Sequence, residues 1–127
     1  MIYGEIHQEV IDSHKEMVSL YRRLGEEKKE IEQHMKILEI RRRLYGEGSH
    51  ETALSYFDVA KVQINCGDYR IALKYISKTL AIYRKILREN PEEEDHLSSN
   101  IDWVKEHLVE CQQEIECCMK FYGTDIA

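Results

Sequence analysis

The chain contains an internal repeat with a period of 42 residues. The segment Tyr3-Gly4-Glu5 recurs as Tyr45-Gly46-Glu47, and Gly25 maps onto Gly67 at the same offset. Self-similarity at a fixed period of roughly 20 to 50 residues indicates a repeat architecture, in which each unit packs against its neighbours. The sequence therefore predicts two copies of one structural unit, followed by a final stretch of different character.

Residues that break regular structure are scarce. The chain of 127 residues has one proline, Pro91, and six glycines, while 33% of its residues are charged and 43% are hydrophobic. Because Gly and Pro punctuate turns, and the alternating β-branched pattern of strands is absent, we expect long helices and no sheet. The hydrophobic fraction is sufficient for a packed core. The predicted fold class is all-α, with antiparallel helical hairpins of a solenoid followed by a long C-terminal helix.

Each repeat resolves into a hairpin of two helices. In repeat one, residues 5–44, apolar residues follow the i, i+3, i+4 spacing on both sides of Gly25, the predicted turn. In repeat two, residues 50–89, the same spacing runs before and after Gly67-Asp68, where the second turn is predicted. The whole chain is interpreted as a single helical-repeat domain.

The chain changes character after Asn90. Asn90 suits a helix N-cap, Pro91 suits the first helical position, and the acidic run Glu92–Asp95 suits the positive end of a helix dipole. A second possible start is Ser99, with Asp102 three residues on in capping-box spacing. From residue 98 to 122 no Gly or Pro occurs, and apolar residues step by three and four as in a coiled-coil seam. The seam is Ile101, Val104, Leu108, Cys111, Ile115, Cys118 and Tyr122. We expect one long helix over residues 98–122 that either caps repeat two or forms a homodimer.

The balance of charge restricts the partners. Against 18 bases the chain has 24 acids, and the formal net charge of -6 argues against a general binder of nucleic acid or of anionic membranes. No long apolar run occurs, and the first residues lack the layout of a secretory signal. The four cysteines form no Cys-x-x-Cys pair, so we expect reduced thiols. The sequence predicts a cytoplasmic protein with no nucleic-acid partner and no membrane insertion.

Repeat two resembles a tetratricopeptide repeat. Ala60 and Ala72 occupy positions where that family has small residues between its two helices, Gly67 lies at the turn, Tyr69 follows it, and Thr79 stands at the third small position. The 42-residue period and the Gly-x-x-x-His connector resemble the longer repeats of kinesin light chain. The resemblance covers roughly residues 1–97. It implies a right-handed superhelix whose first helices line a concave groove that binds extended peptide segments of other proteins.

The family register also implies which residues line this groove. The peptide-binding candidates are Arg22, Arg23, Leu54, Phe57, Asp58, Lys61 and Asn65. Asp12, Lys15, Ser19 and Ile64 fall on the same side. Phe57 would either offer a rigid aromatic contact to a peptide or pack against a neighbouring repeat. Arg22 and Arg23 would hold an acidic or carboxylate-bearing ligand by charge-assisted bonds.

Two further features have alternative interpretations. The first is a group of five arginines, Arg22, Arg23 and Arg41-Arg42-Arg43. They form either a basic patch for acidic peptide or RNA, or a solvated helix face paired with neighbouring glutamates. Trp103, the only tryptophan, lies one residue off the C-terminal seam. It is either a core anchor against repeat two or part of an exposed partner surface.

No arrangement of residues in the sequence predicts catalysis. His107 and Cys111 are four residues apart, as two metal ligands on a helix can be, but no second close pair supplies the remaining ligands. The isolated glycines form no phosphate-binding loop. We therefore expect no catalytic residue, no metal and no cofactor, and we do not expect an enzyme.

The predicted function is that of a protein-interaction scaffold or adaptor, which binds another protein or a peptide segment in the concave groove. One alternative is a structural or assembly module acting through residues 98–122, and another is a non-catalytic accessory domain of a larger enzyme. Tyr3-Gly4 and Tyr122-Gly123 place both ends of the chain at a connector. Because solenoids usually need three or more units, we expect a fragment of a longer array.

Overall fold

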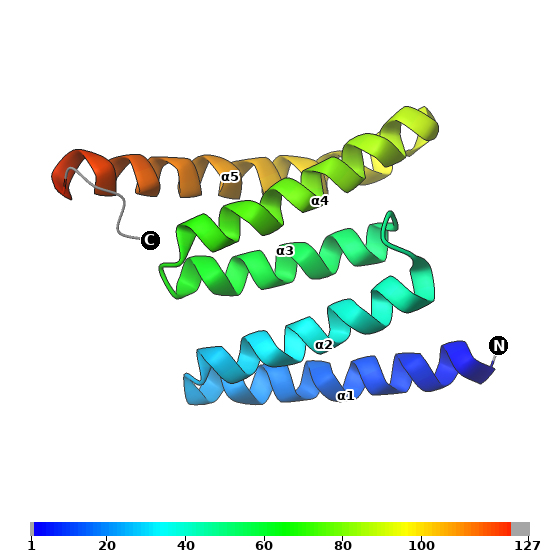
Figure 1. The fold of residues 1–127 in the computed structure, drawn as a ribbon. Helices are drawn as coiled ribbons and strands as arrows, with labels where there is room; N and C mark the ends of the chain where they lie inside the picture. The colour runs from blue at the N-terminus through cyan, green and yellow to red at the C-terminus, as the bar shows by residue number, and fades with distance from the viewer. Residues whose placement is uncertain (1, 123–127) are drawn as a thin grey trace.

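The computed structural model describes residues 2–122, with side chains from residue 7 to residue 120. Within that range the chain forms helices and no strand, which confirms the predicted all-α class. The elements are α1 (Ile2–Leu24), α2 (Glu27–Tyr45), α3 (His50–Asn65), α4 (Tyr69–Glu89), the short 3-10 helix η1 (Pro91–Glu93) and α5 (Glu94–Tyr122). Consecutive helices run antiparallel and lie side by side in chain order, from α1 at one edge to α5 at the other (Figure 1).

Both hairpins turn at the predicted glycines and in the same way. Gly25 has a φ of +72° and Gly67 a φ of +82°, a left-handed conformation that glycine adopts without steric cost. After each glycine, the next residue donates its N–H to the carbonyl five positions back. These capping bonds run from Glu26 to Tyr21 and from Asp68 to Gln63, each at 2.9 Å. The repeat in the sequence is therefore also a repeat of backbone geometry.

The main core lies between α3, α4 and α5. Ala60 of α3 and Ala72 of α4 are fully buried, and their small side chains let the two helices approach closely. Thr79, at the third small position, is fully buried as well. The other members of this core are Ala53, Phe57, Ile76, Leu80, Tyr83, Leu97, Val104 and Cys111. A smaller cluster joins α1 to α2 through Ile11, Val18 and Ile37. Repeat two and α5 thus form the larger packed unit.

The long C-terminal helix begins at Glu94, four residues before its predicted start. Pro91 opens the single turn η1, and the side chain of Asn90 makes no capping hydrogen bond. The helix α5 follows η1 directly and has acidic residues in its first turn, where they suit the positive end of the helix dipole. Leu97, Val104 and Cys111, seven residues apart, are buried in the core that α5 shares with α4. The buried seam therefore starts at Leu97, which the predicted seam omits, and it packs within the chain.

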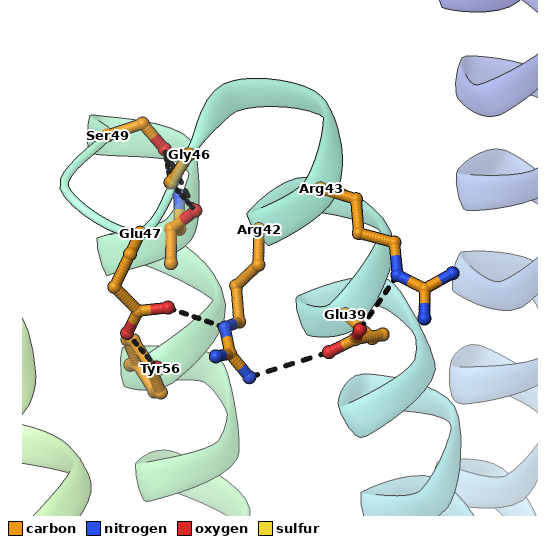
Figure 2. A network of polar contacts seen from close by, with 8 residues as sticks. Glu39, Arg42, Arg43, Gly46, Glu47, Ser49 and Tyr56 are labelled. Carbon is orange, nitrogen blue, oxygen red and sulfur yellow. Dashed lines mark hydrogen bonds and ion pairs between the residues drawn. The ribbon is translucent and has the colours of Figure 1, made fainter.

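A network of ion pairs holds the connector between the two repeats (Figure 2). Arg42, at the end of α2, donates to the Glu47 carboxylate and lies 3.4 Å from Glu39, while Arg43 donates to Glu39 at 2.9 Å. On α3, the hydroxyl of Tyr56 donates to Glu47. This hydrogen bond lowers the pKa of Glu47, and burial followed by the same bond raises the pKa of Tyr56 to about 12. Arg42 and Arg43 are therefore part of a paired helix face.

The carbonyl of Gly46 is the second anchor of this connector. It accepts from the hydroxyl of Thr52 at 2.7 Å and from the hydroxyl of Ser49 at 3.0 Å. Ser49 in turn caps α3, because its oxygen accepts from the Thr52 N–H at 3.1 Å. Arg41 donates to the Ser55 hydroxyl at 2.9 Å and so bridges α2 and α3 directly. Short-range polar contacts thus set the orientation of repeat two against repeat one.

Candidate peptide-binding site

The predicted groove residues of repeat two lie on α3. Leu54, Asp58, Lys61 and Asn65 are three or four positions apart, which places them on one side of the helix. Leu54, Asp58 and Lys61 are partly buried, and Asn65 is exposed. Phe57, by contrast, is buried, with 4% of its surface exposed. The accessible part of this face is therefore polar.

Phe57 is covered by side chains of α5. The ring of Trp103 meets it edge-on with the ring centroids 5.6 Å apart, and the ring of His107 does so at 5.3 Å. His107 Nδ1 lies 3.0 Å from the Trp103 carbonyl oxygen, one turn back on the same helix. Trp103 itself remains 49% exposed. Phe57 thus packs against a neighbouring helix, whereas Trp103 both anchors α5 and presents an aromatic surface.

Lys61 connects this aromatic cluster to an acidic side chain. Its Nζ lies 5.1 Å from the centroid of the Phe57 ring and 4.9 Å from that of the Trp103 ring. The same atom lies 3.4 Å from Asp58 Oδ1. A cation over an aromatic face is attracted by the quadrupole of the ring, so two rings and one carboxylate hold this ammonium in place. The result is a positioned cation next to a half-exposed tryptophan.

Arg22 of α1 is paired inside the first hairpin. Its Nε and Nη2 donate to Glu30 Oε2 on α2 at 3.1 and 3.0 Å. Glu30 is only 4% exposed, and a buried carboxylate needs a partner of this kind to offset its lost hydration. Arg23 is exposed and makes no polar contact with the described residues. Arg22, predicted to bind a carboxylate of the ligand, therefore already binds the carboxylate of Glu30.

His34 of α2 lies between the charged groups of α1 and α3. Its Nε2 is 3.7 Å from Glu30 Oε2, beyond hydrogen-bonding distance, and has no hydrogen-bond partner among the described residues. Burial lowers the pKa of His34, while Asp58 and then Glu30 act in the opposite direction, and Arg22 and Lys61 lower it further. The pKa of the His34 side chain is therefore affected by charges on both α1 and α3.

Of the predicted site residues, the structure pairs Lys61 with Asp58 and places the Lys61 ammonium over the Phe57 ring. Arg22 is joined to Glu30, whose carboxylate lies 3.7 Å from His34 Nε2. Leu54 and Asn65 lie at opposite ends of the α3 face, about 16 Å apart along the helix at ~1.5 Å per residue. Leu54 lies one turn before Asp58 and Asn65 one turn after Lys61, so they flank the charged pair at its two ends.

Sequence reasoning does not find His34 or His107 as residues of this site, and it leaves Trp103 open between a core anchor and an exposed partner surface. A signal for His34 exists, because it falls between Ile31 and Leu38 at helical spacing and so lies on the buried side of α2. Nothing in the sequence indicates that Trp103 and His107 cover Phe57, since this depends on how α5 packs against repeat two.

The described residues contain no group of three or more His, Cys, Asp or Glu side chains placed to hold a metal ion. Cys111, which the spacing in the sequence pairs with His107 as a possible metal ligand, is fully buried in the core. The thiol of Cys66 donates to the Glu27 carboxylate at 2.9 Å, and burial, with this bond second, raises its pKa to about 12. None of the described helices combines the length and the apolar character that crossing a bilayer requires.

A family model of the tetratricopeptide repeat matches residues 7–88. The matched range covers both hairpins and stops before α5. It does not distinguish among kinds of repeat, so the kinesin-light-chain type stays a prediction. No solved structure matches the chain.

Among curated proteins, the chain is similar to several that are named clustered mitochondria protein homolog. It is 26% identical to the one from Emericella nidulans over 107 residues, which are 84% of this chain and 9% of that protein. Identity to the protein of Anopheles gambiae is 37% over 73 residues, 58% of this chain and 5% of the relative. For Aspergillus niger it is 24%, with 96% of this chain and 10% of the relative covered. The chain therefore spans a tenth or less of the length of these relatives.

Proposed function

Since the chain belongs to the tetratricopeptide repeat family, we propose that it is a protein-interaction module, an adaptor or scaffold, that binds a peptide segment of another protein. The binding surface is the α3 face of Asp58, Lys61 and Asn65, continued on one side by the Arg22–Glu30 pair and on the other by Trp103. We call this surface the groove face. It is the side to which the family register assigns ligand contacts.

The observation that carries this proposal is the pairing of Lys61 with Trp103. A half-exposed tryptophan offers a peptide a large rigid contact at low entropic cost, and aromatic residues of this kind dominate binding energy at interfaces. The adjacent ammonium is already positioned to donate to a peptide carbonyl. Ordered groups of this kind lose little freedom on binding, which favours affinity.

The charges of the groove face are largely balanced. Arg22 is paired with Glu30, and Lys61 with Asp58. A ligand therefore gains little from net negative charge here. An apolar or aromatic side chain next to Trp103, with backbone carbonyls near Lys61 and Asn65, is the chemistry that this surface fits best.

The curated relatives are named for clustered mitochondria, and we propose that these repeats serve as the binding part of a longer protein of that kind, in the cytoplasm and without catalysis of their own. Membership in an assembly through α5 is the second candidate. Because Leu97, Val104 and Cys111 are buried within the chain, such an assembly would use the outer side of α5, where Val109 is 48% exposed.

The test compares the protein with a Lys61→Ala/Trp103→Ala variant. Partners that co-purify with the full chain from cells are identified, and the captured peptide segment is then titrated against both purified proteins. We expect the variant to bind at least about tenfold more weakly, because hot-spot truncations cost more than ~1 kcal/mol each. Phe57→Ala is a poor choice, since this ring is buried and its loss disturbs the core.

The matched control is Lys36→Ala/Val10→Ala, which removes a cation and an apolar side chain from exposed positions on α2 and α1 outside the groove face. Circular dichroism verifies that all variants keep their helical content. If the groove variant and the control bind the segment as the parent does, the groove proposal is wrong.

A further inference from the structure

The solvent-facing side of α4 carries an unusual concentration of positive charge. The helix has six basic residues and one acid, Glu89, which gives it a net charge of +5 and leaves 23 of the 24 acids on the rest of the chain. Its exposed positions recur at helical spacing, so they form one stripe along the helix. The basic residues of this stripe are the exposed Lys74, Lys78, Arg84, Lys85 and Arg88, with the partly buried Arg70 at its N-terminal end. We call it the α4 stripe.

Four cations of the α4 stripe differ from Arg22, Arg42 and Arg43 in how their charges are balanced. Arg22, Arg42 and Arg43 each lie within 4 Å of a glutamate of their own hairpin or connector. Among the described residues, no carboxylate forms an ion pair with Lys74 or with Arg84, Lys85 and Arg88. Like charges at this spacing repel one another, which weakens an isolated helix. A bound anion would relieve that repulsion.

One end of the stripe is also hollowed and partly apolar. A shallow groove there is lined by Arg70, Ile71, Leu73, Lys74, Ser77 and Lys78. Ile71 is 42% exposed, although it lies next to cations on an otherwise polar surface. Lys78 packs its ammonium 5.3 Å from the centroid of the Tyr56 ring, which fixes one wall. The surface therefore offers both charge and a place for an apolar side chain.

We propose that the α4 stripe is a second binding surface, separate from the groove face, for an acidic segment of a partner protein. Lys74 and Lys78 are one turn apart, about 6 Å along the helix, close to the distance between alternate residues of an extended chain at ~3.3 Å per residue. Acidic side chains at alternate positions can then pair with successive cations. An apolar side chain at the end of the segment covers Ile71.

Polypeptide fits this surface better than nucleic acid. The stripe has no exposed aromatic ring on which a base could stack, whereas single-strand binders depend on such rings. The rest of the chain is strongly acidic and repels a polyanion that extends past α4. A short acidic segment avoids that repulsion because its charge ends with the stripe.

The experiment measures fluorescence anisotropy of a labelled peptide of about ten residues, the length that spans α4 in extended form. Glutamate alternates in it with serine, and a leucine stands at one end. A peptide with glutamine for glutamate and an oligouridylate of equal length are the comparison probes. The proteins are the parent, Lys74→Glu/Lys85→Glu, the milder Lys74→Gln/Lys85→Gln, and the control Lys28→Glu/Lys36→Glu on α2. All four substituted lysines are exposed, so the fold is retained.

We expect the glutamate peptide to bind the parent and the control equally, and the Lys74→Glu/Lys85→Glu variant at least about tenfold more weakly, since each reversal removes an attraction and adds a repulsion. The glutamine variant should lie between them. Equal binding of all variants, failure of the parent to bind the peptide, or a preference for oligouridylate would each overturn the proposal. The Lys61→Ala/Trp103→Ala variant keeps the stripe, so its unchanged affinity for the acidic peptide separates this surface from the groove face.

Discussion

The ammonium of Lys61 lies 4.9 Å from the centroid of the Trp103 ring, although one residue belongs to repeat two and the other to the C-terminal helix. This contact links the groove face to the packing of α5. Because Trp103 is the only tryptophan of the chain, its fluorescence reports on this junction alone.

A double-mutant cycle measures the strength of this contact. The variants are Lys61→Gln, Trp103→Leu and their combination, and urea unfolding gives the free energy of each. We expect a coupling energy of about 0.5 to 1 kcal/mol, the range of a partly exposed cation–π pair. Additive single effects would show that the two side chains do not interact.

Packing of α5 against α4 is tested by two valines of the same helix. Val104 is 1% exposed and Val109 is 48% exposed. We expect Val104→Asp to lower the free energy of unfolding by at least about 3 kcal/mol, because it buries an unpaired charge. Val109→Asp should change it by less than about 0.5 kcal/mol, as is usual at exposed positions. Equal effects in chemical unfolding would contradict the packing of the seam within the chain.

The turn of repeat two gives a prediction about backbone conformation alone. Gly67 has a φ of +82°, and a Cβ added there would meet no atom within 4 Å. Gly67→Ala should therefore cost about 1 kcal/mol through the left-handed conformation and not through a clash. Gly48→Ala is the control, because this connector glycine has no such φ and equal free space. Thermal unfolding of the two variants should separate them, and a neutral Gly67→Ala would contradict the geometry of the turn.

Buried His34 predicts a dependence of stability on pH. Its pKa is lowered from the ordinary 6.5, mainly by burial, so the unfolded chain binds this proton more tightly than the folded chain does. The associated stability is complete above pH 6.5 and is lost as pH falls through the lower folded value. Glu47, whose pKa is lowered from 4.5, contributes only at more acidic pH.

Urea unfolding at about pH 7.5 and about pH 5 measures this effect, since the two values bracket the ordinary range of histidine. We expect the parent to lose more stability between them than His34→Gln does. The exposed His96→Gln should behave as the parent. An identical loss in all three proteins would rule out His34 as the source.

The backbone plan could be predicted from the sequence, because it depends on local chemistry. Gly25 and Gly67 mark positive φ angles, and the same capping bonds follow them 42 residues apart. Small residues at Ala60 and Ala72 correctly indicate where two helices touch. The predicted start of α5 at residue 98 is four residues late, whereas a cap at Asn90 would have placed the start too early, at Pro91; the structure forms the short turn η1 there, without a capping bond from the Asn90 side chain, and begins the helix at Glu94.

The candidate site could be predicted only in part, because its chemistry depends on contacts between elements. The register of α3 places Lys61 and Asp58 correctly on one face, but the burial of Phe57 depends on α5. Pairing of Arg22 with Glu30 depends on the angle between α1 and α2. The α4 stripe is different, since its charge follows from helical spacing alone and is visible in the sequence once α4 is known to be a helix.

The connector between the repeats has a practical consequence for protein engineering. The bonds that orient α3 run from Glu39 and Arg42 through Glu47 to Tyr56, so they straddle the point at which one hairpin would naturally be cut from the next. A chimaera joined at Gly46 would separate donors from acceptors and alter the angle between modules. A transplanted hairpin should instead include residues 39–56 as one segment, so that the contacts that set the angle between α2 and α3 are kept at each new junction.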